Sequence, residues 1–206
     1  MASAATTTIR LYGSITSPYV RRVRIVAKEL GLEYALLETA SAEGQAKLRA
    51  LTPIWKVPAA EIDGQLVFDS HAITELLLVR ANSSVLPPLA LDDIAARNAI
   101  NVADGALDAL INAFTLAKDG VTPDKSAYVK KQHDRAESSL RWLEKEVPES
   151  WTADKSQLGL AEVVLGSSLA WLRFRDVYPI ARHPRLVRVL ETLERRPSFI
   201  STQPTG

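Results

Sequence analysis

The segment Ser17-Pro18-Tyr19-Val20-Arg21-Arg22 follows a short apolar stretch, residues 9–12, and begins an amphipathic one. A hydroxyl residue before proline is typical of a helix start, because Ser17 can cap free backbone N–H groups and Pro18 needs no N–H at the first helical position. Unpaired N–H groups and the helix dipole attract anions to such a start. Four nearby side chains add positive charge: Arg21, Arg22, Arg24 and Lys28. The segment predicts a site for a thiolate, carboxylate or phosphate, and a plain N-cap with a solvated basic face is the structural alternative.

A second segment, Trp55-Lys56-Val57-Pro58, leads into a predicted strand. Pro58 cannot complete a strand's hydrogen bonds, and its position suits a cis peptide bond in a tight turn. The backbone N–H and C=O of Val57 would then be free to pair with a bound peptide. Lys56 beside them offers a cation for a carboxylate, although a solvated lysine explains it equally well.

A third segment, Asp69-Ser70, lies at another junction between a strand and a helix. The N–H and hydroxyl of Ser70 can hold a carboxylate, and Asp69 can accept a hydrogen bond from an ammonium group. A helix cap is the structural alternative. Together the three segments would bind a thiol, a peptide backbone, a carboxylate and an α-amino acid head group, which are the parts of glutathione.

The composition limits the chemistry that these segments can perform. The 206 residues are 47% hydrophobic, enough for a sizeable core, and contain no cysteine, so any sulfur chemistry needs sulfur from outside. Lysine plus arginine (25) nearly balance aspartate plus glutamate (24), which disfavours nucleic acid and membrane surfaces as partners. Residues 1–8 lack signal-peptide features and predict a loose cytoplasmic N-terminus, and residues 158–172 are too short to span a membrane. The three histidines, His71, His133 and His183, lack metal-ligand spacing, so no metal is expected.

Elements that could position the three segments alternate over residues 1–80, which form the first predicted domain. Apolar spacing predicts strands over 9–12, 34–37, 57–61 and 66–69, and helices over 18–30, 42–50 and 70–78. Asp63-Gly64 predicts a hairpin turn between the last two strands. The order βαβαββα indicates an α/β domain, a small mixed sheet with helices on both faces.

Strand signals end after a predicted linker over residues 81–92, which is rich in Ser and Pro. Residues 93–206 form the second predicted domain, an all-α bundle around a buried helix over 158–172. A last helix begins at Pro184 and is expected to stop at Arg195-Arg196-Pro197. Six side chains could line an apolar pocket, although each also fits a plain core position: Ile15, Leu107, Phe114, Trp171, Phe174 and Tyr178.

Nearly the whole chain resembles the glutathione S-transferase family. The resemblance rests on residues 17–21, 53–58 and 68–73, and it is strongest to small bacterial GST-like proteins that carry a Thr-Ser-Pro-Phe-Val-Arg motif. It implies the GST fold, a thioredoxin-like N-terminal domain followed by an all-α C-terminal domain, and a cytoplasmic homodimer. Two departures are Asp69, one methylene shorter than the usual glutamate, and Trp55, which stands where glycine is common.

The resemblance also implies roles for individual residues. Ser17 would face the glutathione sulfur as the catalytic hydroxyl. The implied glutathione-binding residues are Lys56 near the glycyl carboxylate, Val57 as the backbone clamp before cis-Pro58, Asp69 and Ser70 at the γ-glutamyl group, and, on a weaker match, Asp104 reaching across a dimer.

Two functions remain compatible with these residues. The first is a glutathione transferase that moves alkyl or aryl groups, in which Ser17 stabilises the thiolate that attacks a small hydrophobic electrophile. The alternative is a GST-fold protein that binds glutathione in a stress response with little or no catalysis, because a fold alone does not guarantee turnover.

Overall fold

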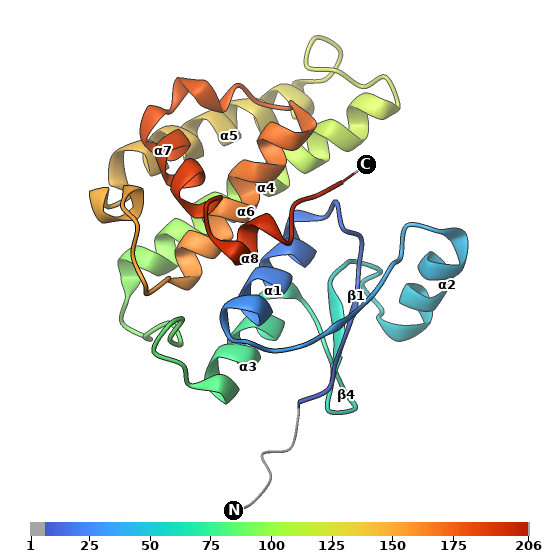
Figure 1. The fold of residues 1–206 in the computed structure, drawn as a ribbon. Coiled ribbons are helices and arrows are strands. Elements are labelled where there is room, and N and C mark those ends of the chain that lie inside the picture. The colour runs from blue at the N-terminus through green and yellow to red at the C-terminus, as the bar shows by residue number, and fades with distance from the viewer. Residues whose placement is uncertain (1–6, 206) are drawn as a thin grey trace, which may run out of the picture. The chain divides into compact units, whose positions relative to one another are not determined.

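Four strands form one mixed sheet in the order β2-β1-β3-β4 in the computed structural model, which describes residues 7–205 (Figure 1). β1 (Ile9–Tyr12) pairs in parallel with β2 (Ala35–Leu37) and antiparallel with β3 (Ala59–Ile62). β4 (Gln65–Val67) returns antiparallel to β3 through the turn at Asp63-Gly64, where both residues have positive φ. The predicted order βαβαββα is confirmed.

Helices cover both faces of this sheet (Figure 1). α1 (Pro18–Glu29) and α3 (Ser70–Ala81) pack together on one face, and α2 (Ala42–Leu51) lies on the other. On the α2 side, Leu48 packs with Tyr12 and Ala59 in a buried apolar cluster. The fold is therefore the predicted thioredoxin-like arrangement, with the sheet held between two apolar layers.

The three arginines of α1, Arg21, Arg22 and Arg24, do not form the solvated or anion-facing surface that the sequence suggests, whereas Lys28 is exposed. Arg21 and Arg24 are buried, and their guanidinium groups donate to the carbonyl oxygens of Phe199 (3.2 Å) and Thr202 (3.3 Å). Phe199 belongs to α8 (Pro197–Ile200), a short helix that the sequence analysis did not predict. These arginines therefore bind the end of the chain to α1, because buried carbonyl groups must be paired.

The chain divides into two compact units. One contains the residues up to Pro88 together with those from Pro197 onward, and the other is Leu89–Arg196. The predicted second domain, residues 93–206, differs from this division at its C-terminal end, because α8 and Thr202 pack on α1. Of the expected loose N-terminus, residues 1–6 lie outside the described residues, whereas Thr8 exchanges hydrogen bonds with Asp63.

The second unit is an all-α bundle, as predicted. Its helices are α4 (Ile94–Lys118), α5 (Ala127–Glu146), α6 (Leu160–Arg175) and α7 (Pro184–Leu193), with 3-10 turns at Glu149–Thr152 and Ile180–Arg182. Every residue of α6 from Leu160 to Leu172 is buried, so α6 is the central helix. At its start, the Glu162 carboxylate accepts a hydrogen bond from the Gly159 N–H (2.8 Å), which supplies half of a capping box because glycine has no side chain to complete it.

A buried polar cluster holds the end of this bundle together. The Tyr178 hydroxyl lies 2.7 Å from a Glu137 carboxylate oxygen and 2.8 Å from His183 Nε2. Burial and the Glu137 carboxylate raise the pKa of Tyr178 to about 12. Burial lowers the pKa of His183, against the opposing effect of Glu144 and Glu137, and Arg141 and Arg182 act in the same direction as burial. His183 is therefore neutral in the folded protein at neutral pH.

We expect this histidine to make folding stability depend on pH. Because its folded pKa lies below the usual value near 6.5, the unfolded chain binds the proton more readily, and stability falls as pH drops below about 6.5, by at most about 1.4 kcal/mol per pH unit. His183→Gln should remove this part of the slope, as measured by urea unfolding between pH 7 and pH 5. His133→Gln, at a half-exposed histidine of the same bundle, is the matched control for the loss of a histidine side chain. Equal slopes in wild type and His183→Gln would contradict the prediction.

Candidate functional site

The three predicted segments meet at one edge of the sheet. β1 ends at Tyr12, which is in register with Ala59 at the start of β3, and Ala60 is in register with Val67 at the end of β4. The loops that follow β1 and β4 and the loop that precedes β3 therefore emerge side by side. Neighbouring strands are about 4.8 Å apart, so the three strand ends span about 10 Å. This distance suits a single small ligand that contacts all three loops.

Ser17 is the N-cap of α1, as predicted. Its Oγ accepts a hydrogen bond from the Val20 N–H at 3.4 Å, and Pro18 occupies the first helical position. The side chain is half-buried. A hydroxyl that accepts in this way still has its own proton to donate. Ser17 can therefore cap the helix and donate to a bound anion at the same time, although its catalytic role stays a prediction.

The loop that carries Ser17 is held by contacts that the sequence analysis missed. The Ser14 hydroxyl lies 3.1 Å from the Thr16 hydroxyl, and Glu38, directly after β2, accepts from the Ile15 N–H at 3.3 Å. At Gly13, an added Cβ would lie 2.3 Å from a methyl group of Val20, so only glycine lets the loop approach α1 this closely. The predicted strand–helix–strand order over residues 9–37 implies that β1 and β2 are parallel, which brings Glu38 to this edge but does not specify its contact with Ile15.

The segment before β3 has the predicted backbone form. The Val57-Pro58 peptide bond is cis, and within residues 7–205 neither the N–H nor the C=O of Val57 makes a hydrogen bond. Val57 itself packs against the cluster around Tyr12 and Leu48, which fixes its position. Lys56 is exposed. The open backbone groups of Val57 can therefore accept and donate to an extended peptide, and their use as a glutathione clamp stays a prediction.

The backbone at Trp55 has a conformation that favours glycine. Its φ is +52°, in the left-handed region where a bulky side chain is strained, and its side chain is 60% exposed. The Arg49 guanidinium carbon lies 5.2 Å from the centre of the indole ring, which is a cation–π contact. A tryptophan therefore occupies a backbone conformation that suits glycine better.

We expect Trp55→Gly to be more stable than Trp55→Ala by about 1 kcal/mol, because alanine keeps the backbone strain and glycine removes it. Urea unfolding of the two variants measures the difference. The matched control is Ala117, exposed on α4, where Ala117→Gly should destabilise by about 1 kcal/mol. A Trp55→Ala variant as stable as Trp55→Gly would show that the residue carries no backbone strain.

Asp69 and Ser70 form the start of α3. One Asp69 carboxylate oxygen accepts from the His71 N–H at 2.9 Å, and the peptide bond that precedes Asp69 is cis. Ser70 is buried, and its hydroxyl makes no hydrogen bond within the described part of the chain. His71 Nε2 lies 3.4 Å from a guanidinium nitrogen of the buried Arg22, which connects α3 to α1. A free hydroxyl and helical N–H groups therefore face the same edge as Ser17, and their assignment to a γ-glutamyl group stays a prediction.

Other predicted residues belong to the helical unit. Asp104 is half-buried on α4, and its predicted role across a dimer remains untested. Of the predicted pocket residues, Leu107 is fully buried and Tyr178 belongs to the polar cluster with His183, so both are core residues. Phe114 and Trp171 meet edge to face with ring centres 5.7 Å apart. Among residues 7–205, no three His, Asp or Glu side chains are arranged to hold a metal ion, and no helix is long and apolar enough to cross a membrane.

The fold and the site together define a class of protein. Its first unit is thioredoxin-like, with the starts of α1 and α3 and the loop before cis-Pro58 at one edge of the sheet, and its second unit is all-α. Comparisons with known proteins agree. The family model of the glutathione S-transferase N-terminal domain matches residues 11–84. The uncharacterized GST-like protein YibF of Escherichia coli K12 is 28% identical over 201 residues, which cover 95% of this chain and 98% of that protein.

Solved structures match over nearly the whole chain. A glutathione S-transferase from Methylobacillus flagellatus KT with GSH bound is 27% identical, with a TM-score of 0.78, over 97% of this chain and 100% of that chain. A glutathione transferase family member from Pseudomonas fluorescens Pf-5 with bound glutathione is 26% identical. Its TM-score is 0.81, and the match covers 96% of this chain and 100% of that chain. Residues 11–84 therefore match the N-terminal domain of the glutathione S-transferase family, and the chain as a whole is similar to glutathione S-transferases.

Proposed function

We propose that this protein binds glutathione at the sheet edge and joins it through its sulfur to a small hydrophobic electrophile. The observation that carries the proposal is the convergence of Ser17, Val57 and Ser70 on one edge through the strand register. Two similar proteins were solved with glutathione in place, which supports the same ligand here. In this proposal the open backbone groups of Val57 pair with the cysteinyl part of glutathione, and Lys56 attracts the glycyl carboxylate.

The reaction begins with loss of the thiol proton to solvent. A free thiol has a pKa near about 8.5, and the start of α1 together with the Ser17 hydroxyl favours the thiolate. The thiolate then attacks the electrophilic carbon, a C–S bond forms, and the leaving group departs with the electron pair of the bond that breaks. Ser17 donates a hydrogen bond throughout and is never covalently modified.

The start of α3 serves as the anchor for the γ-glutamyl group. The Ser70 N–H and hydroxyl donate to its carboxylate, and the second carboxylate oxygen of Asp69 accepts from its ammonium group. Asp69 is exposed and already accepts from His71, so we expect Ser70 to contribute more to affinity than Asp69. We further propose a homodimer, to which Asp104 contributes, in the cytoplasm; light scattering measures the oligomeric state.

Calorimetric titration with glutathione tests the proposal. We expect saturable binding, and we expect Ser70→Ala to weaken it by roughly tenfold, because a hydrogen bond to a charged group is lost. Ser138→Ala, at an exposed serine of α5, is the matched control and should bind as the wild type does. Binding that is absent at millimolar glutathione, or indifferent to Ser70→Ala, would contradict the proposed site.

The alternative function, binding with little catalysis, also has an observation in its favour. Ser17 Oγ already accepts from Val20, so an N-cap role alone accounts for the residue. Turnover of 1-chloro-2,4-dinitrobenzene and of other general electrophiles separates the two functions. Glutathione binding without turnover of any member of a broad electrophile panel would favour the alternative.

A further inference from the structure

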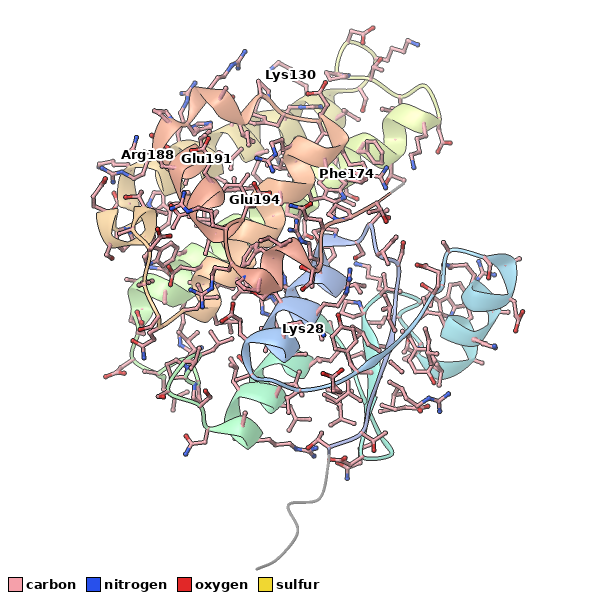
Figure 2. All side chains as sticks on the ribbon, viewed as in Figure 1. Lys28, Lys130, Phe174, Arg188, Glu191 and Glu194 are labelled. Carbon is pink, nitrogen blue, oxygen red and sulfur yellow. The ribbon has the colours of Figure 1, made fainter. Side chains whose placement is uncertain are left out.

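Two cations of the helical unit gather on one aromatic ring. Lys118 Nζ lies 4.5 Å from the centre of the Phe114 ring, and the Arg175 guanidinium carbon lies 5.7 Å from the same centre. The same guanidinium carbon lies 4.7 Å from the centre of the Phe174 ring. Phe174 is labelled on α6 in Figure 2. We call Phe114, Lys118, Trp171, Phe174 and Arg175 the cationic aromatic cluster. It is built entirely from α4 and α6.

The two cations of the cluster have no anionic partner in the part of the chain that the structure describes. Within residues 7–205, neither Lys118 nor Arg175 forms an ion pair, and the acids nearest in sequence, Asp119 and Asp176, do not pair with them. Arg175 Nε is buried and donates no hydrogen bond. A buried donor without an acceptor is rare in proteins and costs free energy until a ligand or water supplies one.

Charge repulsion inside the cluster also favours an added anion. Because both cations lie against the same ring, their charges are within about 10 Å of each other, which is about one Debye length at 0.1 M ionic strength. Helix dipoles explain why a cation occupies the last turn of α4 and of α6, but not why the two converge on Phe114. The edge-to-face contact of Phe114 with Trp171 gives the cluster a rigid apolar base.

We propose that the cationic aromatic cluster binds an aromatic carboxylate or sulfonate. Its rings contact the aromatic part of the ligand, and Lys118 and Arg175 pair with the anionic group. One part of this inference rests on the proposed function. As a transferase, the protein would use the cluster to select electrophiles that carry an acidic group over neutral electrophiles of the same shape. Binding of the acid itself does not depend on glutathione.

Calorimetry without glutathione tests the cluster directly, with 2-naphthoate as the probe and the neutral 2-naphthamide as its matched partner. We expect naphthoate to bind roughly tenfold more tightly than the amide, because a charge-assisted pair is added. Lys118→Gln and Arg175→Gln should each reduce that preference several-fold. Lys118 is exposed, so its variant folds even where substitution of the partly buried Arg175 disturbs packing. Lys131→Gln, at an exposed lysine of α5, should leave the preference unchanged.

Salt provides an independent readout. Raising ionic strength from about 0.05 to about 0.5 M should weaken naphthoate binding several-fold and leave naphthamide binding nearly unchanged, because only the charged pair is screened. Equal affinities for the two probes in the wild type, or a preference that survives in both cluster variants, would overturn the inference.

A kinetic experiment connects the cluster to catalysis. The electrophiles are 4-chloro-3-nitrobenzoate and 4-chloro-3-nitrobenzamide, from which the glutathione thiolate displaces chloride as the C–S bond forms. We expect Lys118→Gln to lower kcat/KM for the benzoate relative to the benzamide by several-fold. Naphthoate binding together with failed glutathione binding would refute the proposed function and keep the cluster, whereas glutathione turnover without any acid preference would refute the cluster alone.

Discussion

Ser17→Ala should lower the turnover of glutathione conjugation at pH 7 by roughly 10- to 100-fold, because the thiolate loses a charged hydrogen bond. Glutathione affinity should change much less, since the other contacts of the tripeptide remain. The pKa of the bound thiol should rise toward the free value near about 8.5. Ultraviolet absorption of the thiolate against pH measures this pKa, and the absence of cysteine means that the only thiol observed is that of glutathione.

Two variants separate donation to sulfur from the cap that Ser17 provides to α1. Ser17→Thr keeps both a hydroxyl and a capping oxygen, so it should retain most of the turnover. Thr16→Val removes the neighbouring hydroxyl that lies 3.1 Å from Ser14, and it should leave the thiol pKa near the wild-type value. Should Thr16→Val raise the thiol pKa while Ser17→Ala does not, Thr16 takes the role assigned to Ser17.

Phe199→Ala should reduce the free energy of unfolding by about 3–4 kcal/mol, the usual effect of removing a buried phenyl ring. The side chain is fully buried, and the Arg21 guanidinium carbon lies 5.6 Å from its ring centre. The Arg21 side chain also donates to the Phe199 carbonyl, so loosening α8 leaves a buried charge with a weaker partner. Urea unfolding, monitored by circular dichroism, measures the change.

Ile200→Ala is the matched control for this prediction. Ile200 follows Phe199 in the same helix but is 55% exposed, so its truncation should cost less than about 0.5 kcal/mol. Equal losses in the two variants would mean that α8 does not hold its place through the Phe199 side chain.

Much of the sheet edge could be predicted from local sequence, because its signals are local. The pair Ser17-Pro18 is enough to predict a helix start, and the pair Asp63-Gly64 is enough to predict a hairpin turn. Both predictions need only local sequence, because capping and turn formation depend on neighbouring residues. The cis form of Pro58 was also predicted from its place before a strand. The structure confirms these features.

The buried arginines could not be predicted, because arginine is usually exposed and only tertiary contacts reveal an exception. Arg21 and Arg24 are separated from their partners, Phe199 and Thr202, by most of the chain. The short helix α8 was missed for the same reason, since four residues carry no periodic signal. The contact between Glu38 and Ile15 also depends on strand pairing, which the pattern of apolar residues did not specify in register.

The return of the C-terminal segment to α1 affects how the protein folds as it is made. Residues 197–205 belong to the same unit as the sheet, but the ribosome adds them only after residues 89–196 have been synthesised. At typical rates of translation that delay is on the order of ten seconds. During this time Arg21 and Arg24 lack the carbonyl groups that they bind in the folded structure. The unit that contains the sheet is therefore synthesised first but is completed only when residues 197–205 emerge.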